Sequence, residues 1–182
     1  MDFLNQYEAP ILHAIQDAIG CPALDGFFSA ITKLGDSGIF WIVLSIVLFV
    51  FKKTRKAGLA MAFSLIIGLV VCNLTLKPLI ARTRPYIFDP SMTLIIPPES
   101  EFSFPSGHTV SSIEAAFALM LNHKKWGIGA MVLAVLIAFS RLYLMVHYPT
   151  DVIAGIIIAI GIGFVANKLA ELVVKKTRLP VA

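Results

Sequence analysis

The apolar runs along the chain constrain its fold more than any other feature. About 20 mostly apolar residues in a helix span the roughly 30 Å hydrocarbon core of a bilayer. We predict transmembrane helices at five runs: residues 34–51, 57–76, 106–122, 126–146 and 150–174. Of the 182 residues, 58% are hydrophobic and 14% charged, which leaves little sequence for a separate soluble module. The predicted fold class is therefore all-α, a polytopic membrane helix bundle forming one domain over residues 1–182.

The N-terminal segment has a different pattern. Residues 3–19 and 24–31 mix apolar and polar positions at roughly helical spacing. We interpret residues 1–32 as amphipathic helices lying at the membrane interface, with a sixth span as the alternative. The first residues contain an acid, no base and no unbroken apolar core, so we expect no cleaved signal peptide. The chain has only two cysteines, which favours neither a disulfide framework nor a thiolate metal site.

The basic residues predict an orientation, because short cytoplasmic loops are enriched in Lys and Arg. Ten of the fifteen basic residues fall in the segments 52–56, 124–125 and 168–178, on one predicted side of the membrane. The other five basic residues are Lys33, Lys77, Arg82, Arg84 and Arg141. They fall on the opposite side of the membrane, together with most of the acidic residues. We therefore expect a cytoplasmic C-terminus and an outer N-terminus. This polarised topology explains the net charge of +4, and nucleic acid is not an expected partner.

Polar residues gather at the outer ends of the predicted spans. Ionisable groups near membrane depth are costly and usually serve a site or pathway. Three cations and a helix N-terminus favour an anion, and the planar fork of Arg suits phosphate. The sequence therefore predicts a phosphate-binding site. Its expected ligands are Lys77, Arg84, Ser106, Gly107 and Arg141.

Two histidines at the same level suggest a reaction. His147 and Asp151 are four residues apart across a predicted helix start, so the carboxylate can orient one imidazole nitrogen and leave the other nucleophilic. Attack by His147 on phosphorus would give a phosphohistidine. His108 would protonate the leaving oxygen and then activate water. Taken singly, each histidine could instead be an incidental residue at a helix boundary.

Three motifs carry a family resemblance. They are "KPLIARTRP" (77–85), "PSGH" (105–108) and "SRLYLMVHYPTD" (140–151). In these motifs the chain resembles the type-2 phosphatidate phosphatase family, which also includes the vanadium haloperoxidases. The matching positions are Lys77, Arg84, Pro85, Pro105, Ser106, Gly107, His108, Ser140, Arg141, His147 and Asp151. The resemblance implies a phosphatase that needs no metal or other cofactor and acts on lipid phosphates or diphosphates. Members commonly have six spans, and this chain is expected to lack the first.

Other polar residues receive simpler interpretations. Glu114 follows His108 by six residues, so we expect it off the face of His108, as a buried hydrogen-bonding residue. Arg82 is a further candidate for phosphate contact, although Arg84 fits the motif. Glu99 and Glu101 have no histidine at ligand spacing, so we do not expect a metal site.

Three function classes follow from these patterns. A membrane lipid phosphatase is favoured. A haloperoxidase would be soluble and larger, and a lipid transporter or scaffold would not need the His147–Asp151 pair. An outward-facing site in a small, loop-poor protein suits undecaprenyl diphosphate, with phosphatidate and phosphatidylglycerophosphate as alternatives. The expected partners are the lipid substrate and the bilayer; the sequence indicates no protein partner and no oligomeric state.

Overall fold

Helices joined by turns and loops make up the part of the chain that the computed structural model describes, residues 2–177 and residue 180, and no strand occurs there. The predicted all-helical class is confirmed. The elements in chain order are α1 (Asp2–Ile19), α2 (Pro22–Lys33), η1 (Asp36–Gly38), α3 (Ile39–Val50), α4 (Arg55–Gly68), η2 (Leu69–Leu76, π-helical), α5 (Lys77–Ile80), α6 (Pro85–Phe88), α7 (Gly107–Asn122), α8 (Lys124–Tyr143) and α9 (Pro149–Thr177).

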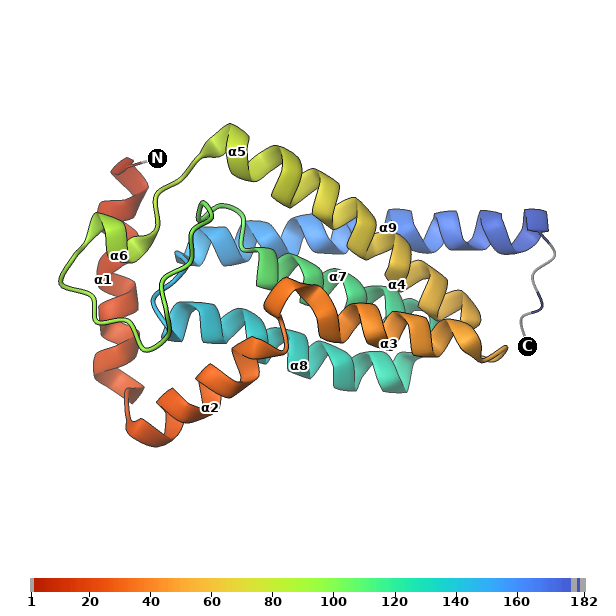
Figure 1. The fold of residues 1–182 in the computed structure, drawn as a ribbon, viewed down its shortest axis with the longest axis horizontal. Coiled ribbons are helices and arrows are strands. Elements are labelled where there is room, and N and C mark those ends of the chain that lie inside the picture. The colour runs from red at the N-terminus through yellow and green to blue at the C-terminus, as the bar shows by residue number, and fades with distance from the viewer. Residues whose placement is uncertain (1, 178–179, 181–182) are drawn as a thin grey trace.

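Helix α7 lies at the centre of a bundle of helices that run side by side along the long axis of the molecule. It packs against α4, α8 and α9, and α3 lies against α4 (Figure 1). Ala115, Ala116 and Ala118 on α7 are fully buried, and these small side chains let neighbouring helices approach closely. Larger apolar side chains such as Ile66 and Val132 are more than half exposed on the outside of the bundle. An exposed apolar surface of this kind suits contact with lipid.

The structure contains fewer long apolar helices than the five predicted spans. Three stretches of the described chain are long and apolar enough to cross a membrane: Arg55–Phe88, Lys124–Tyr143 and Pro149–Thr177. Pro22–Lys33 and Asp36–Val50, bent by 40°, make a fourth if they count as one span. Helix α7 has only 16 residues, about 24 Å of helix.

The predicted run 34–51 is interrupted near its start. Ser37 and Gly38 have left-handed backbone conformations, with φ of 51° and 65°. A right-handed helix cannot continue through such residues. The helical part of this run is therefore the 12-residue α3, and α2 approaches it at an angle.

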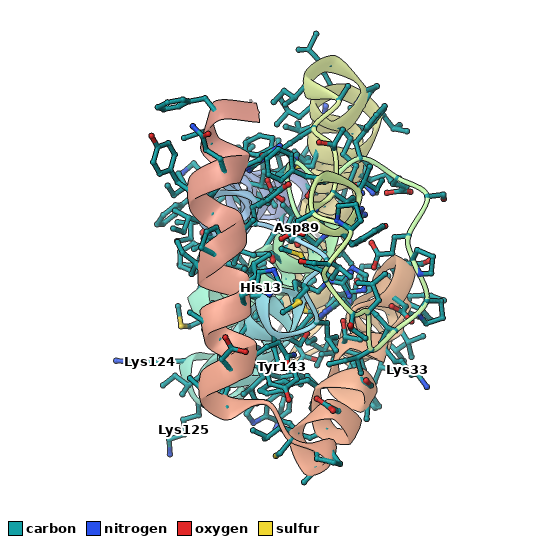
Figure 2. All side chains as sticks on the ribbon, turned by 90° about the vertical axis from the view of Figure 1, so that its left-hand side faces the viewer. His13, Lys33, Asp89, Lys124, Lys125 and Tyr143 are labelled. Atoms are coloured by element: carbon teal, nitrogen blue, oxygen red, sulfur yellow. The ribbon has the colours of Figure 1, made fainter. Side chains whose placement is uncertain are left out.

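The N-terminal helices cover one end of the bundle. Helix α1 stands across that end in Figure 1, and Figure 2, viewed from there, shows His13 of α1 directed toward Asp89. His13 Nε2 lies 2.9 Å from Asp89 Oδ2. The buried face of α1 includes the polar residues Asn5 and Glu8, whereas Phe3 is 68% exposed. The buried face of α1 therefore carries polar groups beside apolar ones such as Leu12, which is fully buried.

A close approach between α3 and α4 gives a test of the packing. A Cβ atom at Gly58 would lie 2.4 Å from the backbone nitrogen of Phe49. Overpacking of this kind typically costs about 1–3 kcal/mol, so we expect Gly58→Ala to lower the midpoint of thermal unfolding in detergent. Gly129→Ala is the matched control, because a Cβ atom there meets nothing within 4 Å. Equal midpoints for the two variants would contradict the close packing.

Candidate active site

The predicted site residues come together at the end of the bundle that α1 covers. A cavity of about 730 Å³ lies there, lined by Lys77, Gly107, His108 and His147 among others. The remaining predicted residues, Arg84, Ser106, Arg141 and Asp151, are buried beside it. A second hollow of about 510 Å³ lies between α1 and Asp89 and contains no motif residue. The larger cavity is therefore the candidate active site.

Left-handed residues turn the chain into this site from two directions. Ala81, with φ of 48°, ends α5 directly before Arg82 and Arg84. Met145, with φ of 56°, follows α8 directly before His147. The backbone amides of residues 146 and 147 both donate to the carbonyl of Arg141, at 3.2 and 3.3 Å. These left-handed turns end the helices just before the functional residues.

His147 and Asp151 are fully buried neighbours. His147 Nδ1 lies 3.4 Å from Asp151 Oδ2, which also accepts hydrogen bonds from Ser103 Oγ at 2.5 Å and the Tyr148 amide at 3.0 Å. His147 Nε2 lies 3.1 Å from Arg84 Nη1. The carboxylate therefore faces one ring nitrogen, and the other points at the cationic side of the cavity.

The surroundings of His147 favour the neutral ring. Burial lowers the pKa of His147 well below its usual range, and the positive charges of Arg84 and Arg141 act in the same direction. His147 lies in the connection between α8 and α9. A neutral imidazole with Nδ1–H directed at Asp151 keeps a lone pair on Nε2, which is the form that can attack phosphorus.

The three predicted phosphate-binding cations are paired with carboxylates from the loop before α7. Lys77 Nζ contacts Glu101, Arg84 Nη2 lies 2.6 Å from Glu99 Oε2, and Arg141 Nη2 contacts Glu99 Oε1. Burial acts to raise the pKa of Glu99, but the charges of Arg141 and Arg84 outweigh it and lower that pKa to about 2. An ionised carboxylate held between two guanidinium groups shows that this position accommodates an anion. The sequence interpretation missed these contacts.

The start of α7 forms the floor of the cavity. Ser106 caps the helix, with its Oγ accepting from the Thr109 amide at 3.4 Å and the Thr109 hydroxyl at 2.9 Å. A Cβ atom at Gly107 would lie 3.6 Å from Lys77 Nζ, so the start of the helix lies next to this cation. The unpaired amides and helix dipole at this end favour a bound anion.

His108 has a partner that the sequence interpretation did not identify. His108 Nε2 lies 2.8 Å from Asp36 Oδ1, in the turn before α3. A Cβ atom at Gly35 would lie 2.6 Å from His108 Cδ2, so the imidazole packs directly against that glycine. The interruption "GDSG" (35–38) in an apolar run was the available sequence signal. Asp36 fixes the ring through one nitrogen and leaves the other for proton transfer.

Arg82 does not contact the phosphate side of the cavity, which corrects its interpretation as a candidate phosphate ligand. Arg82 is 2% exposed and contacts Asp151, and its guanidinium carbon lies 3.9 Å from the ring centre of Tyr148. Its hydrogen-bond acceptors are Asn5, Glu8, Thr150 and Asp151. Arg82 therefore connects α1 to the start of α9, a contact between segments far apart in sequence that the motif pattern did not indicate.

Glu114 is buried as predicted, but its Oε2 has no hydrogen-bond partner among the described residues, so the expected hydrogen bond is not found. Glu114 lines the same cavity as Gly107 and His108. Gly107 precedes it by seven residues, almost two full turns, so the two residues share a helix face. Within the described residues, no group of three or more His, Cys, Asp or Glu side chains is arranged to hold a metal ion.

The chain is similar to known proteins in sequence and in fold. The model of the PAP2 superfamily matches residues 57–174. An undecaprenyl-diphosphatase of Sulfolobus acidocaldarius is 35% identical over 80% of this chain and 70% of its own length. The undecaprenyl-diphosphatase BcrC of Bacillus subtilis is 32% identical over 82% of this chain and 76% of its own length. The crystal structure of a transmembrane PAP2-type phosphatidylglycerolphosphate phosphatase from Bacillus subtilis superposes with a TM-score of 0.74 at 29% identity, covering 94% of this chain and 88% of that one.

A membrane helix bundle with a buried His–Asp pair beside three cations defines the class of the protein as a multi-pass membrane phosphatase. The chain belongs to the PAP2 superfamily, and the family resemblance predicted from the three motifs is confirmed.

The contact between Asp36 and His108 generates a prediction. Asp36→Asn should lower kcat for phosphate release by about 10- to 100-fold, less than the roughly 100- to 10,000-fold effect of a general acid–base group itself, because His108 is still present. KM should change little, because Asp36 touches His108 and none of the phosphate-binding cations. Asp17→Asn on the exposed surface of α1 is the control. A wild-type kcat for Asp36→Asn would show that this contact does not position the histidine.

Proposed function

We propose that the protein removes a phosphate group from a membrane lipid at the outer face of the membrane, through a phosphohistidine on His147. The observation that carries this proposal is the placement of His147 between Asp151 on one side and Arg84 on the other, at a cavity wall. The arrangement supports a nucleophile that is oriented by a carboxylate and faces a phosphate-binding site.

The reaction proceeds in two steps. His147 Nε2 attacks phosphorus as the bond from phosphorus to the lipid oxygen breaks, and His108 gives its proton to that oxygen. His108 then takes a proton from water, whose oxygen attacks phosphorus. The phosphorus–nitrogen bond breaks, inorganic phosphate is released and the His147 ring is restored. Lys77, Arg84, Arg141 and the amides at the start of α7 stabilise the negative charge that develops on the phosphoryl oxygens. These groups supply the positive charge, so the step requires no metal.

The favoured substrate is undecaprenyl diphosphate. Two relatives above 30% identity are named for this activity. The cavity also suits a prenyl chain, because Ile42, Leu65, Leu69 and Val110 give it an apolar wall formed by α3, α4, η2 and α7. Phosphatidylglycerophosphate is the alternative that a specific observation favours, since the superposed crystal structure is of a phosphatase named for that lipid. Phosphatidate remains a third candidate from the motifs.

The proposed topology has about five spans. Helix α3 with the bent α2 before it, α4 with η2, and the helices α7, α8 and α9 cross the membrane, and α1 lies at the outer interface. The basic segments 52–56 and 124–125 and the end of α9 lie at the opposite end of the bundle from α1 (Figure 1). Short basic loops favour the cytoplasm, which supports an outer active site and a cytoplasmic C-terminus. Arg178, in the predicted basic tail, lies outside the described residues.

The nucleophile gives the direct test. His147→Ala should lower phosphate release by at least about 1,000-fold, because no other group could form the covalent intermediate. Release is measured in detergent from undecaprenyl diphosphate, phosphatidylglycerophosphate and phosphatidate, with and without EDTA. We expect the highest kcat/KM for undecaprenyl diphosphate and no effect of EDTA.

His13→Ala is the matched control, because His13 pairs with Asp89 outside the cavity. Retention of wild-type turnover by His147→Ala would contradict the mechanism. Loss of wild-type activity in EDTA would contradict the metal-free step, and a clear preference for another lipid would contradict the substrate assignment.

A further inference from the structure

The cavity extends beyond the phosphate site along α7. Gly107, Val110, Ser111 and Glu114 line it on successive turns of the helix. Gly107 and Glu114 are separated by about 10 Å of helix rise, and helical side chains lean toward the N-terminus, which shortens this gap. The same cavity therefore has a phosphate-binding end at Lys77 and His147 and a carboxyl group further inside the bundle.

Glu114 is built into the cavity wall without a protein partner. Its side chain is 1% exposed, and its Oε2 has no hydrogen-bond partner among the residues that the structure describes. A Cβ atom at Gly68 would lie 2.3 Å from both carboxyl oxygens. The carboxyl group thus rests directly on the backbone of α4 at the point where the π-helical η2 begins. Glycine at position 68 makes the room for it.

An unpartnered carboxyl group at this depth restricts what can fill the cavity. Burial of an ionised carboxylate without a cation is very costly, so such groups keep their proton, and even the neutral acid needs a hydrogen-bond partner. A pure hydrocarbon chain against Glu114 would leave that need unmet. The neutral acid has one O–H donor, which fits an acceptor oxygen on the bound molecule.

We propose that Glu114 forms a second polar subsite that donates a hydrogen bond to a substrate oxygen located between the transferred phosphoryl group and the hydrocarbon chain. The inference rests on the proposed function and adds to it a residue that determines specificity. Two lipid groups present such an oxygen: the second phosphate of a lipid diphosphate and the ester carbonyl of a glycerolipid. A prenyl monophosphate has neither of them.

Substrate comparisons with two Glu114 variants test the subsite. Glu114→Gln keeps a neutral donor of similar shape, and Glu114→Met replaces it with an apolar side chain of similar length. We measure kcat/KM for farnesyl diphosphate, farnesyl monophosphate and dioctanoyl phosphatidate. Glu114→Met should lose about 10- to 100-fold on the lipid that carries the recognised oxygen, mainly through KM, with farnesyl monophosphate unchanged. Glu114→Gln should stay within about threefold of wild type on all three.

The pattern of loss identifies the recognised oxygen. Selective loss on farnesyl diphosphate assigns Glu114 to the second phosphate, and selective loss on phosphatidate assigns it to an ester carbonyl. An equal change on all three lipids, or no change, would overturn the subsite.

Gly68→Ala tests the same contact without altering the carboxyl group. The added methyl group must displace the Glu114 side chain, so we expect the same substrate-selective loss as in Glu114→Met. Gly129→Ala, where a Cβ atom meets nothing within 4 Å, is the control. Unfolding midpoints in detergent show whether each variant is folded. If the wild-type protein releases phosphate from none of the lipids, the proposed function fails. If the wild-type protein releases phosphate from these lipids, and Gly68→Ala and Glu114→Met keep the wild-type substrate ratios, only this inference fails.

Discussion

The hydrogen-bonded surroundings of Asp151 hold the site together. Its carboxylate accepts from Arg82 at 2.6 Å, from Ser103 at 2.5 Å and from the Tyr148 amide, and its backbone carbonyl accepts from the Ser106 amide at 3.2 Å. One residue at the start of α9 therefore joins three other segments: the one after α5, the loop before α7 and the connection before α9. A buried carboxylate is stable only with such a complete set of donors, so the ring of His147 is oriented by the same contacts that assemble the fold.

The three cations of the phosphate-binding site are neutralised by carboxylates that do not belong to the Asp151 network. Lys77, Arg84 and Arg141 would repel one another inside the bundle, and Glu99 and Glu101 neutralise them in the absence of substrate. A phosphate group must replace these carboxylates, which belong to a loop and not to a helix. The cations are thereby kept in position for an anion without leaving buried charges unpaired.

The sequence was sufficient for the helical class, the three motifs and their convergence at one end of the bundle, because hydropathy and spacing encode these features locally. It did not reveal Asp36 beside His108, or Glu8 and Asn5 around Arg82, because these contacts join residues 72 to 77 positions apart. Arg82 and Arg84 are both arginines of one motif, and the motif alone does not show that Arg84 contacts His147 while Arg82 contacts Asp151. The sequence interpretation also did not show that Glu114 lines the cavity, because it compared Glu114 with the helix face of His108 and not with that of Gly107.

The central claim is that His147 carries the phosphoryl group, and rapid quenching tests it most directly. The protein is mixed with a lipid diphosphate labelled in its terminal phosphate, quenched in alkali within the first turnover, digested and mapped by mass spectrometry. The account predicts label on the imidazole of His147 and none in His147→Ala. Label on any other residue, or phosphate release in the first turnover without a labelled protein, would contradict it.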